Sequence, residues 1–530
     1  MAIAQSTLAE ALADPALHGA LGHLRRGIEK ESLRVAPDGT LARTPHPRAL
    51  GSPLTHPSIT TDFSEAQVEL ITGVSESIEA SLAQLEEVHA WVYRGIGDEI
   101  LWAASMPCVL QGDDNIPVGR YGTSNVGMAK TVYRRGLGHR YGRLMQTISG
   151  IHYNFSVPEA FWTWLAQREG WRGDLQELAS ARYFDLIRNF RRQSWLLFYL
   201  FGASPAVCRS FLAGREHGLV PFDEGTLHLP WATSLRMGGL GYQSDAQANL
   251  KVSYNGLASY ARTLEGALTQ PYPPYEAMGL ERDGEFIQLS TSLLQIENEF
   301  YGTIRPKRSI HPGERPLHAL GERGVEYVEV RCMDLNPFLP LGIDSETIRF
   351  LDVFLIHCLL AESPPDFPEE IEAMQRNRTR IVEEGRRPGL ELEDQPGVLR
   401  PLDGWASEIL DGCARTAEAI DAAQGGHAAR DSVAVQRARI ADAALTPSAQ
   451  ILQAMRDEGV PFFRFAMDRS LAHAERFRGH ALDEATVARL QAQVEHSLAE
   501  QARIEAEDQV DFATYRLEYI EQPLLPVTTS

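Results

Sequence analysis

The sequence predicts an α+β fold followed by a largely helical C-terminal part. Up to about Pro340, short segments that alternate polar and apolar residues are interleaved with segments of helical period. Beyond Asp344 almost every segment has helical period. No repeat of solenoid length and no low-complexity tract interrupts this order. We therefore expect an α+β core over residues 1–343 and a helical region over residues 344–530 that packs on it.

Composition and charge narrow the class of protein. The chain has 530 residues, 44% of them hydrophobic, and a net charge of −21, which is typical of a soluble globular protein. The acidic excess disfavours nucleic acid and anionic membrane surfaces as partners. The longest uncharged run, Gln193 to Cys208, is shorter than the roughly 20 apolar residues that span a bilayer. Residues 1–29 carry acidic residues among apolar ones, which predicts an amphipathic helix rather than a secretory signal.

The cysteines predict a reducing environment. There are five, with no C-x-x-C pair, at Cys108, Cys208, Cys332, Cys358 and Cys413. This odd, scattered set argues against a disulfide framework and against a thiolate zinc site. We therefore expect a cytoplasmic protein.

Four C-terminal segments have strong helical signals. Thr446 and Pro447 stand where a helix cap and first turn are expected. The expected helices cover residues 345–362, 402–423, 446–459 and 483–507.

Two N-terminal segments place carboxylates on one face of a strand. In GIEKESLRV, Glu29 and Glu31 share a face about 7 Å apart, given the rise of a strand. In TTDFSEAQVELIT, acidic and amide residues including Glu69 alternate with apolar ones, and Asp62 lies just upstream. Ordinary half-exposed strands also look like this, so each segment alone leaves that interpretation open.

Two further segments add an imidazole and a guanidinium. In LMQTISGIHYNFSVP, alternation puts Gln146, His152 and Asn154 on one face. A histidine in a strand is more often structural than a metal ligand, but amide neighbours on both sides favour a site. In GVEYVEVRCMDLNPF, Glu329 and Arg331 share a face. They fit either a plain ion pair or a metal ligand beside a phosphate-binding arginine.

Together these residues suit a hard divalent cation. The donors are Glu29, Glu31, Asp62, Glu69, His152 and Glu329, a set that favours Mg²⁺ with nucleotide oxygens over zinc. Basic residues that suit a phosphate chain follow at Arg236, Arg305, Lys307 and Arg308. The chain has neither a P-loop nor a G-x-G-x-x-G motif.

Longer motifs resemble a known family. From about Gly27 to Pro340 the chain contains, in order, GIEKESLRV, LTHPSITTDFSEAQVELIT, SMPC, YGTSNVG, RYGRLMQTISGIHYNFS, LPWATSLRMGGLGY, LQIENEFYGTIRPKR and VEYVEVRCMDLNPF. This series resembles the proteobacterial type of glutamate–cysteine ligase. The resemblance implies a glutamine-synthetase-like antiparallel sheet that forms a funnel-shaped active site.

The resemblance also implies an activity. The expected reaction is ATP- and Mg²⁺-dependent ligation of the γ-carboxylate of L-glutamate to the amine of L-cysteine through a γ-glutamyl phosphate, the first step of glutathione biosynthesis. A related γ-glutamyl ligase with another acceptor amine, or a non-catalytic binding protein on the same scaffold, would need lost pocket residues or lost ligands. The expected partners are small molecules only, and the expected state is a monomer.

The resemblance assigns roles residue by residue. The metal ligands are the six donors given above. The acceptor pocket resembles Tyr133, Leu137, Gln146, Tyr242 and Tyr301, with Arg134 or Arg236 near a substrate carboxylate. Arg331 and Asn154 are expected at phosphate and glutamate, with Arg236 beside them in catalysis, and Arg305 and Lys307 at the nucleotide.

Overall fold

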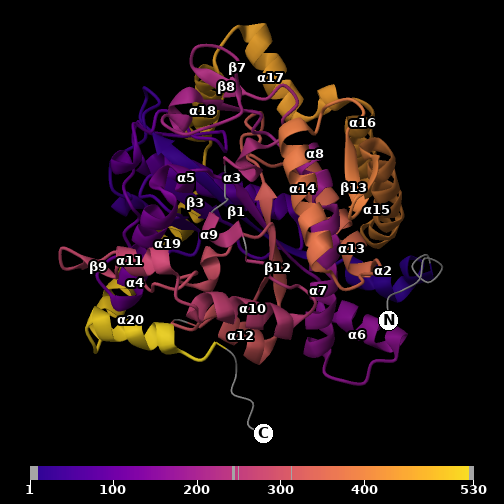
Figure 1. Cartoon of the computed structure of the whole chain (residues 1–530), viewed down its shortest axis with the longest axis horizontal. Coiled ribbons are helices and arrows are strands. Elements are labelled where there is room, and N and C mark those ends of the chain that lie inside the picture. The colour runs from indigo at the N-terminus through magenta and orange to yellow at the C-terminus, as the bar shows by residue number, and fades with distance from the viewer. Residues whose placement is uncertain (1–9, 241–244, 249, 312, 525–530) are drawn as a thin grey trace.

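The computed structural model describes residues 10–240, 245–248, 250–311 and 313–524. Its central feature is a seven-stranded antiparallel sheet with the order β11-β12-β5-β1-β3-β2, to which β4 adds by pairing with β1 (Figure 1). The strands are β1 (Arg25–Val35), β2 (Ile59–Thr61), β3 (Gln67–Ile71), β4 (Ile100–Leu101), β5 (Ile151–Ser156), β11 (Ile304–Lys307) and β12 (Tyr327–Met333). The antiparallel α+β fold predicted from the sequence is confirmed.

One face of this sheet is apolar and covered by helices. Ile28, Val68, Tyr153, Val328 and Val330 are buried on it. The helices α3 (Ile78–Gly95), α7 (Leu175–Gln193), α8 (Trp195–Phe201) and α13 (Ser345–Leu360) pack against the strands or against one another there. The opposite face carries the polar residues of the site, because strand side chains alternate between the two faces.

A buried ion pair joins the sheet to the first C-terminal helix. The Arg26 guanidinium of β1 lies 3.1 Å from the Asp352 carboxylate of α13. The Tyr153 hydroxyl of β5 donates to the same carboxylate at 2.5 Å. All three side chains are almost completely buried. The helical region is therefore attached to the two central strands by specific polar contacts.

The predicted C-terminal helices are present, with one exception to the helical pattern. They are α13, α15 (Leu402–Gln424), α17 (Pro447–Glu458) and α19 (Glu484–Glu507). Between them lies a two-stranded hairpin, β13 (Glu391–Gln395) and β14 (Val398–Pro401), where we expected only helices. Its turn contains Gly397 at a φ of 76°, a conformation that glycine adopts readily.

The N-terminal prediction was wrong in part. Helix α2 covers only Pro15–Leu21, with Asp14 as its N-cap, and the chain enters β1 at Arg25. Residues 1–9 of the predicted helix lie outside the described residues. Among the residues that the model describes, no helix is long and apolar enough to cross a membrane.

The cysteine prediction also needs correction. Cys108 and Cys208 form a disulfide, although they are 100 residues apart in the chain, while Cys332, Cys358 and Cys413 are buried free thiols. The sequence could not indicate this pair, because the two cysteines meet only through the tertiary fold.

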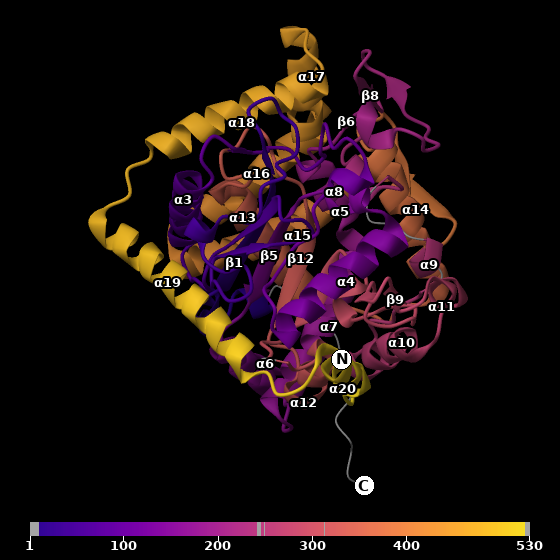
Figure 2. The ribbon, with the colours of Figure 1, turned by 90° about the vertical axis from the view of Figure 1, so that its left-hand side faces the viewer.

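The last helices surround the core. α18 (Phe462–Gly479) and α19 follow its outer edge in Figure 2, and both contact α3. α20 (Phe512–Glu521) packs against α4 (Asn125–Tyr141). The remaining elements are α5 (Arg143–Gln146), α6 (Glu159–Glu169), α9 (Asp245–Ala248), α10 (Leu257–Thr269), α11 (Pro273–Met278), α12 (Pro316–Arg323), α14 (Pro368–Glu384), α16 (Ala428–Ala441), β6 (Ala206–Cys208), β7 (Val220–Pro221), β8 (Thr226–His228), β9 (Glu281–Arg282) and β10 (Glu285–Phe286).

A lysine is buried on the apolar face of the sheet. Lys30 of β1 is 4% exposed, and its ammonium group lies 2.7 Å from Nε2 of His89. The other ring nitrogen of His89 bonds to the Leu85 carbonyl oxygen at 2.7 Å, which leaves Nε2 as the acceptor for Lys30. Burial lowers the pKa of Lys30 to about 7.

We predict that Lys30→Met stabilises the protein by roughly 1–4 kcal/mol at pH 6, because it removes a buried charge that has no carboxylate partner among the described residues. Lys30 has a lower pKa folded than unfolded, where it is about 10.4, so the unfolded chain binds more protons between pH 7 and pH 10. The wild-type protein should therefore gain stability across this range, and the advantage of the variant should shrink. Urea unfolding at pH 6, 7.5 and 9 measures this; an advantage that stays constant with pH would contradict it.

Candidate active site

The pairing of strands brings the predicted acidic residues together on the polar face of the sheet. Glu29 of β1 lies opposite His152 of β5, and Glu31 lies opposite Glu69 of β3. Glu329 of β12 lies opposite Asn154. Residues directly opposite one another in an antiparallel pair have side chains in contact range.

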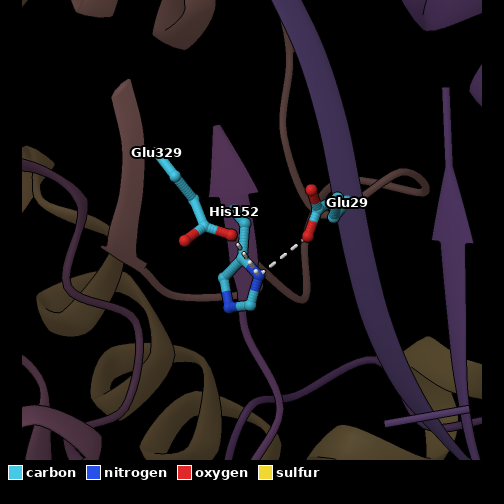
Figure 3. Close-up of side chains that lie close together, drawn as sticks. All are labelled: Glu29, His152 and Glu329. Carbon is cyan, nitrogen blue, oxygen red and sulfur yellow. Dashed lines mark hydrogen bonds and ion pairs between the residues drawn. The ribbon is translucent and has the colours of Figure 1, made fainter. Parts of the chain in front are cut away.

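His152 lies at the centre of this group (Figure 3). Its Nδ1 is 3.2 Å from a carboxylate oxygen of Glu29 and 3.8 Å from one of Glu329. Its Nε2 is 3.4 Å from a carboxylate oxygen of Glu31. Ligand atoms of Glu29, His152 and Glu329 lie within 4.8 Å of one another, close enough to share one metal ion.

Half of the acidic group is compensated by cations. Burial alone would raise the pKa of Glu329, but the charges of Lys307 and Arg331, at 3.4 and 3.1 Å, lower it well below its ordinary value. Burial and the charge of Glu329 would raise the pKa of Glu29, but the hydrogen bond with His152 and the charges of His152 and Lys307 together lower it to about 2. These two carboxylates are ionised at neutral pH.

In the other half, burial and like charges outweigh the nearby cations. Burial, followed by the charge of Asp62, raises the pKa of Glu31 to about 7. Burial and the charges of Glu29, Asp62 and Glu31 raise the pKa of Glu69 well above its ordinary value. Like charges that share a site produce this effect unless a cation lies between them. Asp62, which directly follows β2, belongs to this half of the group.

The acceptors of this group fit a divalent cation. In the described part of the chain, Oδ1 of Asn154 is buried and accepts no hydrogen bond, and Oε2 of Glu329 is buried 3.1 Å from the Arg331 guanidinium. The donor set is five carboxylates and one imidazole, and hard cations such as Mg²⁺ prefer oxygen ligands. A bound cation would also relieve the repulsion between Glu31, Asp62 and Glu69. The residues present therefore fit Mg²⁺.

Asn154 and Arg236 have definite places beside this group. The Asn154 amide donates to a carboxylate oxygen of Glu29 at 2.8 Å. Arg236 is 1% exposed, donates to the Arg331 carbonyl oxygen at 3.1 Å and lies 3.6 Å from the Asp334 carboxylate. Arg236 is therefore buried beside the site, next to the backbone of Arg331.

The predicted nucleotide residues on β11 differ from each other. Lys307 contacts Glu329 and is 29% exposed. Arg305 is 7% exposed and donates to the carbonyl oxygens of Asn298 and Phe300. Lys307 therefore faces the carboxylates, whereas the guanidinium of Arg305 holds the chain before β11.

The described acceptor residues come from two helices, α4 and α5, and from the segment before β11. Tyr133 and Leu137 lie on α4. Gln146 ends α5, so the expectation that it continues the face of β5 was wrong, because the strand begins only at Ile151. The hydroxyl of Tyr301 donates to the Gln146 side chain at 3.2 Å. Tyr242 lies outside the described residues.

Arg134, the second basic residue of α4, contacts backbone carbonyl oxygens. Nε of Arg134 donates to the Asp62 carbonyl oxygen, and the two terminal nitrogens contact the carbonyl oxygens of Lys130 and Thr61 at 3.1 and 3.4 Å. These contacts do not test the expectation that Arg134 or Arg236 lies near a substrate carboxylate, which stays a prediction.

A glycine missed by the sequence analysis matters to the site. The backbone N–H of Gly150 donates to Glu31 at 2.8 Å. A Cβ atom at this position would lie 2.0 Å from a terminal nitrogen of Arg236. A glycine inside an alternating polar segment is the signal that could have indicated this close approach.

Removing one carboxylate from each half should have opposite effects on stability. In chelator, Glu329→Gln should lower the free energy of unfolding by roughly 2–3 kcal/mol, because Lys307 and Arg331 lose their buried partner. Glu69→Gln should leave it unchanged or raise it, since repulsion is relieved. Urea unfolding in chelator measures both; equal losses in the two variants would contradict the division into compensated and uncompensated halves.

Known proteins are similar to this chain in sequence and in structure. The family model for glutamate-cysteine ligase matches residues 9–381. Curated glutamate–cysteine ligases from Alcanivorax borkumensis and Pseudomonas aeruginosa are each 52% identical, over 94% and 93% of this chain and 96% and 93% of theirs. The crystal structure of the Francisella tularensis enzyme in complex with AMP is 37% identical, with a TM-score of 0.88 over 94% of this chain and 97% of that one. The chain belongs to the glutamate–cysteine ligase family.

Proposed function

We propose that this protein joins the γ-carboxylate of L-glutamate to the amine of L-cysteine with ATP, the first step of glutathione biosynthesis. The observation that carries the proposal is the row of carboxylates around His152, bordered by Lys307 and Arg331. Membership of the glutamate–cysteine ligase family supports the same reaction. A carboxylate is a poor electrophile, so the reaction needs a phosphoryl donor and a site that binds its charge.

The six predicted ligands would hold Mg²⁺ on the polar face of the sheet: Glu29, Glu31, Asp62, Glu69, His152 and Glu329. When bound, Mg²⁺ neutralises charge on phosphate and carboxylate oxygens during phosphoryl transfer. Glu29 and Glu329, whose pKa values are lowered, would offer ionised oxygens to it, and Glu31 and Glu69, whose pKa values are raised, would bind it in their deprotonated form.

The nucleotide would approach from the side of Lys307. A cavity of about 170 Å³ there is lined by basic and aromatic side chains, including Lys307, Arg308 and Tyr327, and by apolar residues of α12 such as Leu317. Lys307 lies between this cavity and Glu329. A base in the cavity would thus place its phosphates over Lys307 and toward the carboxylates. The relative from Francisella tularensis was solved with AMP, which agrees with nucleotide binding in this family.

Arg331 and Asn154 would act on glutamate and the transferred phosphoryl group, with Arg236 beside them. The side chain of Arg331 is 22% exposed. Burial would lower its pKa, but the neighbouring carboxylates, Glu329 first, raise it, so the guanidinium stays charged. Its guanidinium is suited to the phosphoryl oxygens, whose charge it stabilises. In the first step a γ-carboxylate oxygen bonds to the γ-phosphorus of ATP and ADP leaves.

The acceptor amine would be held by Tyr133, Leu137, Gln146 and Tyr301, with Tyr242 expected beside them. The cysteine nitrogen then bonds to the acyl carbon of γ-glutamyl phosphate, and phosphate leaves with the bonding electrons. The proton of the amine passes to solvent or to the leaving phosphate. Apolar and aromatic walls exclude water, which would otherwise hydrolyse the intermediate. A ligase for another amine is the alternative, and the hydrogen-bonded Tyr301–Gln146 pair favours a small polar acceptor.

The division into domains, the oligomeric state and the cellular location are also proposals. Residues 1–343 would form the catalytic core, and residues 344–530 a helical region that packs on it. We propose a monomer in the cytoplasm, where ATP is available and where the three free thiols would persist. The Cys108–Cys208 disulfide is unusual for that compartment.

The decisive experiment traps the intermediate. With ATP, Mg²⁺ and glutamate but no cysteine, added hydroxylamine should give γ-glutamyl hydroxamate and an equal amount of ADP, because a strong nucleophile replaces the amine. Cysteine should divert the product to γ-glutamylcysteine by competing for the same electrophile. Both products are measured by mass spectrometry, together with coupled ADP release.

The controls separate a ligase from a hydrolase. Omitting Mg²⁺ should stop both products, as should Glu329→Gln. Folded enzyme that releases ADP with glutamate yet forms neither hydroxamate nor dipeptide would contradict the proposed function. Hydroxamate formation together with a preference for another amine would instead support the alternative acceptor.

A further inference from the structure

The backbone beside Asp62 is held by two side chains from outside the sheet. The Tyr121 hydroxyl shares its one proton between the carbonyl oxygens of Thr61 and Asp62, at 2.7 and 2.9 Å, and accepts a hydrogen bond from the Thr61 hydroxyl at 2.9 Å. Arg134 donates to the same two carbonyl oxygens. Its guanidinium carbon lies 4.4 Å from the centre of the Tyr121 ring. One phenol and one guanidinium, stacked together, therefore hold both carbonyl groups.

These contacts matter because few others among the described residues fix the backbone at Asp62. The residue follows the three-residue strand β2, and its N–H donates to the Gln67 carbonyl oxygen at 3.0 Å. Its carboxylate accepts no hydrogen bond from any residue that the structure describes. The direction of the carboxylate thus depends on the backbone that carries it. The other predicted acidic ligands lie within β1, β3 and β12, where ladder hydrogen bonds fix the backbone.

The turn that carries Tyr121 is in turn held by the end of α19. The backbone N–H groups of Thr123 and Asn125 donate to Glu505 at 2.8 Å and to Asp508 at 2.7 Å. The Asn125 side chain donates to the Val510 carbonyl oxygen at 2.9 Å. These contacts join segments more than 380 residues apart in the sequence.

Gly122 shows how close this contact is. It has a φ of 84°, which favours glycine. A Cβ atom there would lie 2.2 Å from Nε2 of Gln501 and 2.3 Å from Oε1 of Glu505. Asp508 also lies at the N-terminal end of α4, where a negative charge is stabilising.

We propose that Tyr121 and Arg134, held through the 121–125 turn by Glu505 and Asp508 of the C-terminal segment, are positioning residues that aim the Asp62 carboxylate at the metal. This inference rests on the proposed function, which makes Asp62 a ligand. It assigns Arg134 a role different from binding a substrate carboxylate. It also gives Glu505 and Asp508, at the end of α19 and just after it, a part in metal binding, although neither is a proposed ligand.

The test measures metal binding rather than turnover. Mn²⁺ is titrated into the full-length enzyme by isothermal calorimetry, without nucleotide or substrates. Tyr121→Phe keeps the ring that stacks on Arg134 and removes the hydroxyl. It should weaken Mn²⁺ binding about tenfold, a typical effect of losing a group that orients a ligand.

Tyr93→Phe is the matched control. Tyr93 is also buried, and its hydroxyl accepts a hydrogen bond from the backbone N–H of Leu101 at 3.1 Å, away from Asp62. Its loss should lower the free energy of unfolding by a similar amount and leave the affinity for Mn²⁺ unchanged. Equal affinities for Mn²⁺ in folded Tyr121→Phe and Tyr93→Phe would overturn the proposal.

Further variants test the contact between Asp508 and the backbone N–H of Asn125. Asp508→Ala should weaken Mn²⁺ binding in the same direction as Tyr121→Phe but less, and Asp508→Asn, which keeps an acceptor, should restore part of it. Asp511→Ala removes a helix cap from the same segment, that of α20, and should not change it. An effect of Asp511→Ala as large as that of Asp508→Ala would overturn the role of Asp508.

Asp62→Asn distinguishes the role of Asp62 as a metal ligand from the positioning role of Tyr121 and Asp508. If it weakens Mn²⁺ binding while Tyr121→Phe and Asp508→Ala do not, the positioning role fails and the metal site stands. If Asp62→Asn leaves Mn²⁺ binding unchanged, Asp62 is not a ligand, and both this inference and that part of the proposed function are overturned. Far-ultraviolet circular dichroism confirms that each variant is folded.

Discussion

The structure depends on how a row of carboxylates is tolerated on one face of a sheet. Glu29 and Glu329 are balanced by His152, Lys307 and Arg331, so their pKa values are lowered in spite of burial. Glu31 and Glu69 face each other across β1 and β3 with Asp62 nearby, and their pKa values are raised. Without a cation between them, these carboxylates repel one another and destabilise the fold. A bound divalent cation would relieve this repulsion.

The rest of the fold keeps these strands in register. The apolar face is covered by α3, α7, α8 and α13, and the Arg26–Asp352–Tyr153 contacts attach α13 to β1 and β5. The C-terminal helices then follow the outer edge and end against α4 (Figure 2). The polar face is thus left for the site, while the chain far from it in sequence stabilises its borders.

Much of this could be predicted from the sequence, because alternation in a strand has a strict period of two. It put Glu29 and Glu31 on one face, and His152 and Asn154 on another strand's matching face, as the structure has them. Their roles as ligands stay predictions. Gln146 was misplaced because alternation cannot indicate where a strand begins: the chain turns through α5 and Gly150 before β5.

Features that depend on tertiary contacts could not be predicted in this way. The Cys108–Cys208 pair and the contact of Asp508 with Asn125 join distant segments. The β13–β14 hairpin escaped because strands so short carry little periodic signal beside long helices. Arg134 was assigned to a substrate by resemblance, and only its contacts with backbone carbonyl oxygens indicate another role.

The central claim is that the acidic face of the sheet binds divalent cations next to the phosphates of the nucleotide. A crystal structure with Mn²⁺, a non-hydrolysable ATP analogue and glutamate tests it most directly, since anomalous scattering locates the metal without assumptions. We expect manganese peaks between Glu29, His152 and Glu329 and beside Glu31, Asp62 and Glu69, with the phosphate chain reaching them past Lys307. A nucleotide bound elsewhere, or a face free of manganese in the presence of bound nucleotide, would contradict the account.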